Sequence, residues 1–344
     1  MKPGMRPSAP ESLVHNLFLL AAALLVAAFL GEAALRAAFP LEVQFVKRGD
    51  LFFYAPGAEF SSATHEFNAV FATNSLGFVD RDHAVEKREG VKRIAFLGDS
   101  FTQAIHFPPS KKFTGLIEEK LSSPGNVEVL NFGFGGTGTL EQNKYLESVA
   151  LGYDLDVVVL VFFTNDVQDN EGYSRIQGDP FRAWRRELST SSLFYRLLHK
   201  SLVLLIDSAS NRPPAFSQSY SASGGEGAWN ATSDALKKTQ KLSSSSGARF
   251  LLAYLPAQYE VHREALIEFN EKYPGEAFDF AYPSKRLRDF SASEGIEFLD
   301  LSPFLRDYSQ RTGEYLYFKQ DGHLNAAGHA AVAEALAPAI ERLL

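Results

Sequence analysis

The chain has 344 residues, of which 45% are hydrophobic, so it can bury a sizeable core. Its net charge of −7 argues against a nucleic-acid partner, because a surface that binds phosphates must be basic. Cysteine is absent, which excludes disulfides, thiolate nucleophiles and cysteine-based zinc sites.

An apolar segment near the N-terminus, "LFLLAAALLVAAFLG", is the first predicted element. It belongs to a stretch of about 20 residues without Asp, Glu, Lys or Arg, the length of a helix that crosses a bilayer. Lys2 and Arg6 precede it, so the positive-inside rule predicts a cytoplasmic tail over residues 1–11 and an uncleaved membrane anchor over residues 12–39. The rest of the chain is then expected on the extracytoplasmic, periplasmic side. A cleaved signal peptide ending near "GEA" and a buried core helix are the alternatives.

Residues 40–91 are aromatic and polar, with turn-forming residues that predict short strands in an extracytoplasmic stem. From residue 92 onward, apolar runs alternate with amphipathic helices, and a strong helix, "NAAGHAAVAEALAPAIERLL", closes the chain. This alternation is typical of a parallel α/β sheet, so residues 92–344 are expected to form one domain. The expected strands are RIAFLGDS, VEVLNFGFGG, DVVVLVFFTND, RFLLAYLP and IEFLDL.

The alternating pattern lapses over about residues 170–246, which we interpret as an insertion that forms a lid or a surface excursion. Its first part is expected to contain one or two helices. Its second part, "DSASNRPPAFSQSYSASGGEGAWN", is rich in Ser, Gly and Pro and predicts a flexible loop. The apolar run "SLVLLI" is too short to span a membrane and is expected to pack against protein.

Polar groups follow the ends of three expected strands, and a fourth group precedes the closing helix. They are Ser100 in "GDS", the glycine cluster "NFGFGGTGT", Asn165 in "FFTND", and His323 in "FKQDGH". Ligands bind at the carboxyl ends of the strands in open α/β sheets, so these groups are expected to meet there. Acyl transfer needs a nucleophile, a base, a group that orients the base, and oxyanion donors. Taken singly, each group also suits a turn, a helix cap or a structural histidine.

In this order, the four segments resemble the blocks of the SGNH (GDSL-type) hydrolase superfamily, which contribute Ser, Gly, Asn and His. The resemblance covers roughly residues 93–344. It extends to bacterial membrane-anchored members and, in the D-x-H spacing, to polysaccharide O-acetyltransferases of the alginate acetylation type. It implies a flavodoxin-like α/β/α sandwich with a parallel sheet and a serine that attacks an ester carbonyl.

The resemblance also implies a role for each matching residue. Ser100 matches the nucleophile and, through its backbone N–H, the first oxyanion donor. Gly136 and Asn165 match the second and third donors, and His323 matches the general base.

The acid of the triad departs from the best-known members, which place it three residues before the histidine. That position here is Gln320, which carries no charge. Asp321, two residues before His323, is the nearby carboxylate and is the acid that we expect. His329 lies further along the chain and is expected to be structural.

The sequence therefore predicts a serine esterase that cleaves short acyl or O-acetyl esters, with acetylated carbohydrate as the suggested substrate. One alternative is a polysaccharide O-acetyltransferase with the same triad. Another is a non-catalytic carbohydrate-binding scaffold, which Gln320 would favour. We expect no cofactor and no metal, because His323 and His329 lack the i, i+4 spacing and a third ligand.

Overall fold

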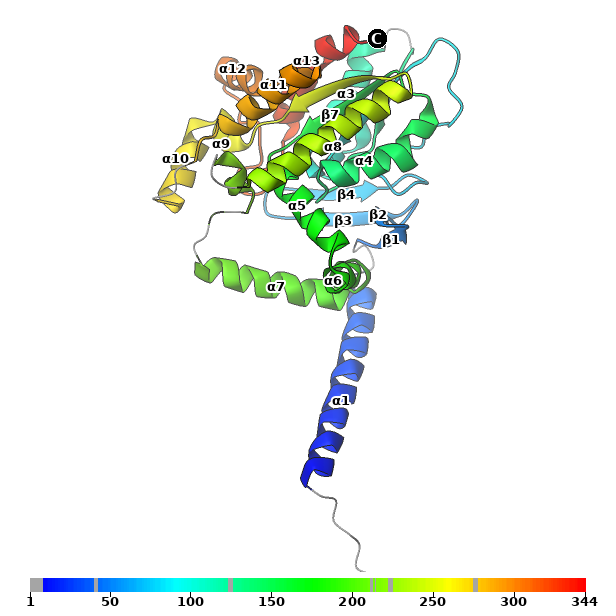
Figure 1. Ribbon diagram of the computed structural model, residues 1–344, viewed down its shortest axis with the longest axis vertical. Helices are drawn as coiled ribbons and strands as arrows, with labels where there is room; N and C mark the ends of the chain where they lie inside the picture. Colours follow the sequence, from blue (N-terminus) through cyan, green and yellow to red (C-terminus); the bar gives the residue numbers. More distant parts are fainter. Residues whose placement is uncertain are drawn as a thin grey trace, which may run out of the picture.

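The computed structural model describes residues 9–39, 43–122, 126–210, 213, 215–221, 225–274 and 278–344. Its centre is a parallel five-stranded sheet in the order β6-β5-β7-β8-β9 (Figure 1). This is the flavodoxin-like order, in which the chain starts near the middle of the sheet and winds outward in both directions. The predicted parallel α/β fold is confirmed. The strands are β5 (Lys92–Gly98), β6 (Val127–Asn131), β7 (Val157–Phe162), β8 (Arg249–Tyr254) and β9 (Glu297–Asp300).

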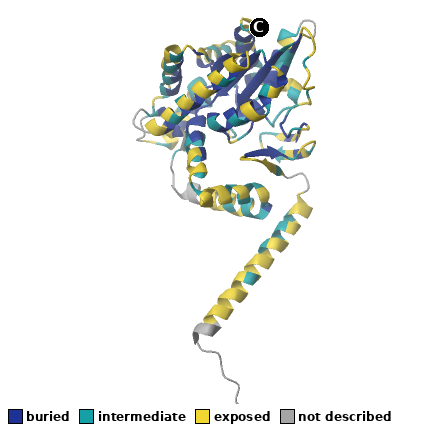
Figure 2. Cartoon of the chain, turned by 45° about the vertical axis from the view of Figure 1, so that its right-hand side comes forward, coloured by how far each residue is buried: buried dark blue, intermediate teal, exposed yellow. Residues whose placement is uncertain are grey.

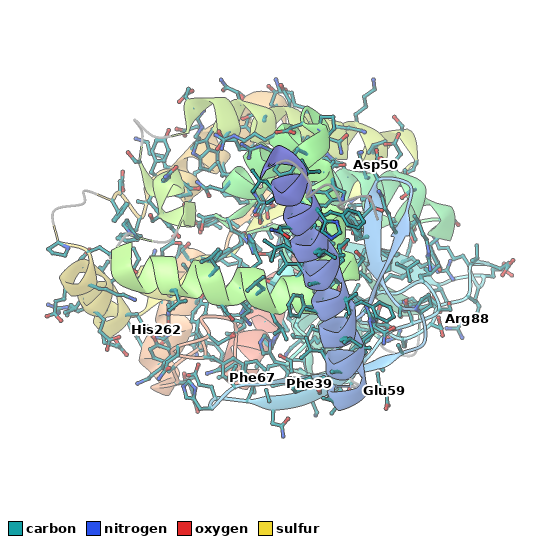
Figure 3. The ribbon with its side chains drawn as sticks, turned by 90° about the horizontal axis from the view of Figure 1, so that it is seen from below. Phe39, Asp50, Glu59, Phe67, Arg88 and His262 are labelled. Atoms are coloured by element: carbon teal, nitrogen blue, oxygen red, sulfur yellow. The ribbon has the colours of Figure 1, made fainter. Side chains whose placement is uncertain are left out.

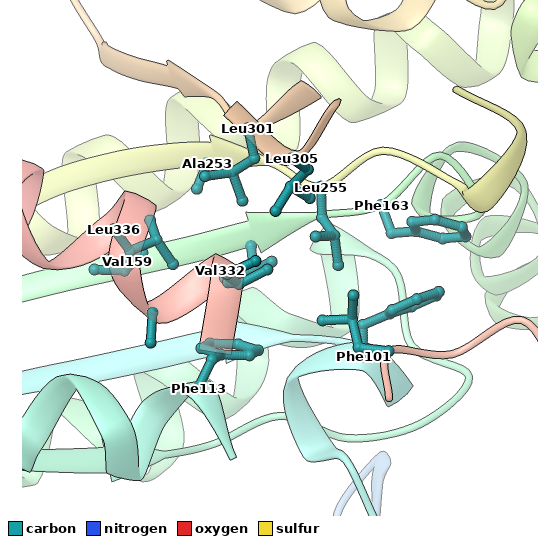
Figure 4. Close-up of a cluster of buried hydrophobic side chains, with 14 of the residues drawn as sticks. Phe101, Phe113, Val159, Phe163, Ala253, Leu255, Leu301, Leu305, Val332 and Leu336 are labelled. Carbon is teal, nitrogen blue, oxygen red and sulfur yellow. The ribbon is translucent and has the colours of Figure 1, made fainter. Parts of the chain in front are cut away.

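Helices cover both faces of this sheet because each central strand is apolar on both sides. In β7, Val157, Val159 and Val161 belong to one buried cluster, and the residues between them belong to another. The first cluster lies beneath α3 and α13 (Figure 4). The second lies beneath α4, α8 and α11. The helices of the two layers are α3 (Phe113–Leu121), α13 (Ala326–Glu341), α4 (Thr139–Ser148), α8 (Glu226–Ser245) and α11 (Tyr282–Glu294).

The predicted stem forms two antiparallel hairpins that pack into the body. Phe53, Phe60 and Phe78 are all less than 4% exposed and share the second core cluster with Phe134 and Tyr145 of the sheet domain. Residues 43–91 are therefore continuous with the core of the sheet domain rather than a separate stalk. The hairpin strands are β1 (Phe45–Arg48), β2 (Leu51–Tyr54), β3 (Glu59–Ala63) and β4 (Asn68–Ala72).

The apolar N-terminal segment forms one long helix, α1 (Ala9–Ala38), which projects away from the body (Figures 1 and 2). Its segment Leu13–Ala38 is long and apolar enough to cross a membrane, and the structure buries none of it. A buried core helix is therefore excluded, whereas a membrane span and a signal sequence both fit. Lys2 and Arg6 of the expected tail lie outside the described residues.

The segment 170–246 contains both sheet-covering and peripheral elements. Helix α5 (Asp166–Gln177) packs against α8, which covers the sheet. Helices α6 (Pro180–Ser191) and α7 (Leu193–Ser210) lie instead beside the end of α1 (Figure 1). Part of the expected loop is a short 3₁₀ turn, η3 (Ala215–Tyr220), in which Tyr220 is fully buried.

The remaining helical elements lie around the rim of the sheet. They are α2 (Ser100–Gln103), η1 (Pro109–Lys111), η2 (Ala150–Tyr153), α9 (Gln258–Val261), α10 (Arg263–Lys272) and α12 (Ser302–Thr312).

Candidate active site

Ser100 is the first residue of the short helix α2, directly after β5. Gly98 ends the strand, where a side chain would collide with Thr102, since an added Cβ would lie 2.2 Å from Oγ1. Asp99 is the N-cap, and its carboxylate accepts a hydrogen bond from the N–H of Phe101 at 2.9 Å. This tight turn from strand to helix holds the Ser100 hydroxyl at the carboxyl end of the sheet.

His323 lies in the loop formed by residues 318–323, which we call the histidine loop. The residues that flank it, Tyr317 and Leu324, pair as an isolated antiparallel bridge. Gly322 has a φ of +83°, a conformation that favours glycine, and its N–H donates to the carbonyl of Phe318 at 2.8 Å. The histidine loop is thus a closed turn with a defined backbone.

The structure brings Ser100, His323 and Asp321 together in one hydrogen-bonded chain. Ser100 Oγ lies 2.8 Å from Nε2 of His323, and Nδ1 of His323 lies 2.7 Å from Oδ1 of Asp321. The side chain of Gln320 is exposed, and the sequence offset of Asp321 does not prevent this contact. The geometry can move a proton from the serine to the imidazole while the carboxylate holds the ring.

The glycine cluster between β6 and α4 lies beside Ser100. Asn131 fastens this loop to α2, since its amide donates to the carbonyl of Thr102 at 2.7 Å. A Cβ added to Gly135 would lie 3.5 Å from the Ser100 Cβ, so the loop backbone approaches the serine closely at this point. Gly136 follows in an exposed position with a φ of +73°.

Asn165 follows β7 and stands at the start of α5. It lines the same cavity as Ser100 and His323. Its amide oxygen is buried without a hydrogen-bond partner. An amide at this place can turn its NH₂ group toward a ligand that enters the cavity.

The cavity at the carboxyl end of the sheet has a volume of about 630 Å³. Ser100 and His323 lie along one side of it, and helices α9 and α10 form the other. A second cavity of about 690 Å³ lies under the β1–β2 hairpin, lined by residues such as Leu51 and Tyr153, and contains none of the predicted site residues. The aromatic and polar side chains of the first cavity are Phe101, Phe163, Gln258, Tyr259, Glu268, Phe269, Lys272, Tyr273 and Lys319.

Two residues that support the site were not predicted from the sequence. His106 is almost fully buried, and its Nε2 lies 3.4 Å from the Asp321 oxygen that also contacts His323. Glu66, at the tip of the β3–β4 hairpin, accepts hydrogen bonds from the backbone N–H groups of Gln320 and Asp321 at 2.9 and 2.7 Å. Both contacts fix the position of the Asp321 carboxylate.

The pKa values of Asp321 and Asp99, two carboxylates at the site, are shifted in opposite directions. Burial would raise the pKa of Asp321, but hydrogen bonds from His106 and His323 outweigh it and hold this pKa well below its usual value. Burial raises the pKa of Asp99, and the hydrogen bond from the Phe101 N–H opposes that rise. Asp321 is therefore the carboxylate that stays charged beside the imidazole across the neutral range.

His106, Asp321 and His323 together offer three potential metal-ligand atoms within 4.8 Å of one another. An ion held there would need a nitrogen of His323, whose Nδ1 contacts Asp321 and whose Nε2 contacts Ser100. A metal would thus displace the contact that orients the imidazole toward Ser100. His329 takes no part in this cluster: it is buried, and its Nδ1 accepts a hydrogen bond from the N–H of Phe113 at 3.1 Å.

Comparisons with known proteins identify the family to which the chain is similar. A model of the GDSL-like lipase/acylhydrolase family matches residues 96–331. No curated protein sequence matches the chain. Similar solved structures include TesA, at 15% identity and a TM-score of 0.44 over 74% of this chain and 100% of that one. An acetyl xylan esterase, AlAXEase, matches at 17% identity and a TM-score of 0.45, over 72% and 99%. A lipolytic protein of the G-D-S-L family from Veillonella parvula DSM 2008 matches at 15% identity and a TM-score of 0.41, over 73% and 100%.

Proposed function

This chain belongs to the GDSL-like lipase/acylhydrolase family and is a hydrolase that acts on esters; from this premise we propose that it cleaves short acyl esters through Ser100, His323 and Asp321. The observation that carries the proposal is the pair of contacts from Ser100 to His323, at 2.8 Å, and from His323 to Asp321, at 2.7 Å. In this mechanism, His323 removes the hydroxyl proton as Ser100 attacks the ester carbonyl. Asp321 keeps the imidazole in the right tautomer and stabilises its protonated form.

The oxyanion of the tetrahedral intermediate is held, in this proposal, by the N–H groups of Ser100 and Gly136 and by the amide of Asn165. The close approach of the glycine loop to Ser100 and the position of Asn165 in the cavity support this assignment. Each such donor typically contributes about 10²–10³ in rate. Collapse of the intermediate breaks the ester C–O bond, and the departing alcohol takes the proton from His323, which leaves the acyl group on Ser100. His323, now neutral, removes a proton from a water molecule that attacks the acyl carbonyl, and the second intermediate collapses to the free acid and Ser100, whose oxygen recovers that proton.

As the substrate class, we propose O-acetylated carbohydrate of the cell envelope or of exported polysaccharide. The cavity opposite Ser100 combines the aromatic side chains of Tyr259, Phe269 and Tyr273 with the charged Lys272 and Lys319. A sugar ring has apolar faces and hydroxyl edges, and this mixture of aromatic and hydrogen-bonding groups suits both.

The test follows the release of p-nitrophenol from p-nitrophenyl acetate and butyrate by the purified full chain, beside the variant Ser100→Ala. We expect release by the wild type and loss of nearly all of it in the variant. Release that is independent of an added oligosaccharide supports hydrolysis. Release that the sugar accelerates, with acetate appearing on the sugar, would show an O-acetyltransferase instead. A folded wild type that releases nothing would contradict the proposal.

For localisation, we propose that α1 is an uncleaved anchor and that the body lies on the extracytoplasmic, periplasmic side. The described part of the protein buries none of the apolar segment Leu13–Ala38, which supports a lipid environment for it. The positive charges of Lys2 and Arg6 favour a cytoplasmic N-terminus. A reporter that is active only outside the cytoplasm, fused after Leu344, should give signal, and a cytoplasm-specific reporter at the same place should not. The reverse result would overturn this topology.

A further inference from the structure

Helix α1 is joined to the start of α7 by a polar clamp. Glu32 of α1 accepts hydrogen bonds from the backbone N–H groups of Leu193 and Phe194, at 3.1 and 2.8 Å, and from the Ser192 hydroxyl at 2.9 Å. These N–H groups belong to the first turn of α7 and have no partner within that helix, so the carboxylate caps α7. Arg36 lies 2.7 Å from Glu32 and completes the clamp.

The pair α6–α7 is also attached to the body. Arg186 of α6 forms an ion pair with the buried Glu141 of α4. Lys47 of β1 lies 2.6 Å from Glu187 of α6. Contacts from two sides therefore hold the helix pair between α1 and the body. Viewed from below, α7 lies across the underside of the body and close to α1 (Figure 3).

These two helices expose large apolar side chains that the described residues leave uncovered. Phe181 and Trp184 of α6 are 63% and 55% exposed, and their rings stack at 5.7 Å. Leu198 and Leu202, one turn apart on α7, are 59% and 54% exposed. Apolar residues gathered on adjacent helices mark an interaction surface, unlike apolar residues scattered singly.

Among the described residues of the same helices, the exposed charged side chains are three basic ones and one acidic one, Glu187. Arg182, Arg185 and Lys200 are all exposed. Aromatic side chains together with Arg and Lys are typical of segments that lie at the boundary between lipid headgroups and acyl chains. The basic charges also suit the anionic headgroups of phospholipids.

The length of the apolar part of α1 places α6 and α7 at the level of the bilayer surface. Between Leu13 and Leu30, α1 contains no Asp, Glu, Lys or Arg, and the clamp with α7 begins directly afterwards at Glu32. At 1.5 Å per residue, this apolar part is about 27 Å long, close to the hydrocarbon thickness of a bilayer. The clamp, and with it α6 and α7, would then lie where the bilayer ends.

We propose that α6 and α7 rest on the surface of the bilayer that α1 crosses, with Phe181, Trp184, Leu198 and Leu202 in contact with phospholipid. The inference depends on α1 being the anchor proposed above and adds to it a second, peripheral contact with the membrane. This contact would hold the body in one orientation relative to the membrane.

The two tryptophans of the chain allow a direct test, because Trp184 is exposed on α6 and Trp229 is buried in the body. The full chain is reconstituted into vesicles of phosphatidylcholine and phosphatidylglycerol, with and without brominated phosphatidylcholine, which quenches nearby tryptophan fluorescence. We expect Trp184 to be quenched several-fold more strongly than Trp229. The Trp184 signal is the difference between the wild type and Trp184→Phe, so the buried Trp229 need not be altered.

Two further measurements separate the possible failures. Flotation of the vesicles after an alkaline wash reports insertion of α1, independently of α6 and α7. If the chain floats but Trp184 is not quenched, the membrane contact of α6 is wrong although the anchor stands. If the chain does not float, both the anchor and the membrane contact of α6 are wrong.

The double substitution Leu198→Glu and Leu202→Glu should reduce quenching of Trp184, whereas Val70→Glu, at a similarly exposed apolar residue on β4, should not. If Val70→Glu reduced the quenching of Trp184 as much as the double substitution does, the proposal would be contradicted. It would also be contradicted if brominated lipid did not quench Trp184 and the chain self-associated in detergent through the surface that contains Trp184.

Discussion

Asp321 contacts two imidazoles through the same carboxylate oxygen: Nδ1 of His323 at 2.7 Å and Nε2 of His106 at 3.4 Å. The backbone N–H of Asp321 is held in turn by Glu66. A carboxylate that is bound at both its side chain and its backbone has little freedom to rotate away from His323. This arrangement supports the proposal that Asp321, at the D-x-H offset, is the acid of the triad.

The substitution Asp321→Asn should lower kcat by about 10³–10⁴-fold, because a neutral amide neither stabilises the imidazolium nor enforces the required tautomer. Gln320→Ala is the matched control, since that side chain is exposed and its backbone N–H remains available to Glu66. Steady-state kinetics with p-nitrophenyl acetate and circular dichroism of each variant make the measurement. If Gln320→Ala were the damaging change, the assignment of the acid would be wrong.

Sequence reasoning identified the residues that follow strands, because strand ends in a parallel sheet converge at one edge. Ser100 and Asn165 meet there for that reason, whereas His323 reaches the same edge from the loop that precedes α13. It did not identify His106 or Glu66, whose positions depend on tertiary packing. His106 belongs to no motif in the sequence, and Glu66 lies in a hairpin that ends at Ala72, well before the sheet begins at Lys92. The D-x-H pair in the sequence carried no indication of a second histidine.

At the scale of elements, the β3–β4 hairpin reaches the histidine loop. Glu66 accepts two hydrogen bonds from this loop. In addition, Phe67 packs edge-on against His106, with ring centroids 4.4 Å apart, and its ring is tilted against that of Phe318 at 5.4 Å. The five strands of the sheet could be predicted from the sequence because each of them lies in a largely apolar run. Helix α8 was missed because its polar, Ser- and Thr-rich sequence hides an apolar stripe that includes Trp229 and Leu236.

Glu66→Ala should lower kcat about tenfold, or by ~1.4 kcal/mol of transition-state stabilisation, because the histidine loop loses the acceptor of two backbone N–H groups. Glu66→Gln keeps a side-chain oxygen at that place and should retain most of the activity. His65→Ala, at an exposed neighbouring residue, controls for changes in the hairpin itself. Kinetics of the three variants at one pH provide the comparison. Equal losses for Ala and Gln would mean that charge, rather than the hydrogen bonds, is what Glu66 supplies.

At the scale of the whole molecule, the buried side chain of His329 makes the stability of the folded protein depend on pH. Burial, helped by the positive charge of Lys112, lowers the pKa of His329 from its ordinary 6.5 to about 3. In the unfolded chain this imidazole takes up a proton as the pH falls below about 6.5, whereas in the folded protein it stays neutral until about pH 3. The unfolded state binds more protons in that window, so stability decreases as the pH falls through it.

We therefore expect His329→Gln to flatten the pH dependence of stability between about pH 7 and about pH 5, by at most about 1.4 kcal/mol per pH unit. The variant should be less stable than the wild type at neutral pH, because its packing against Phe113 is lost. The apparent melting temperature of the full chain in detergent, followed by near-ultraviolet circular dichroism, measures both effects. Parallel curves for wild type and variant would mean that other groups set the acid sensitivity.

The packing of residues 43–91 into the second core cluster determines which fragments of the chain can fold when they are expressed alone. The family match begins at residue 96, and a fragment that started there would lack Phe53, Phe60 and Phe78. The faces of Phe134 and Tyr145 that those rings cover would be open to water, and the histidine loop would lose Glu66. Expression of the homologous region alone should thus yield aggregated or inactive material, and the shortest useful recombinant fragment begins before the first hairpin.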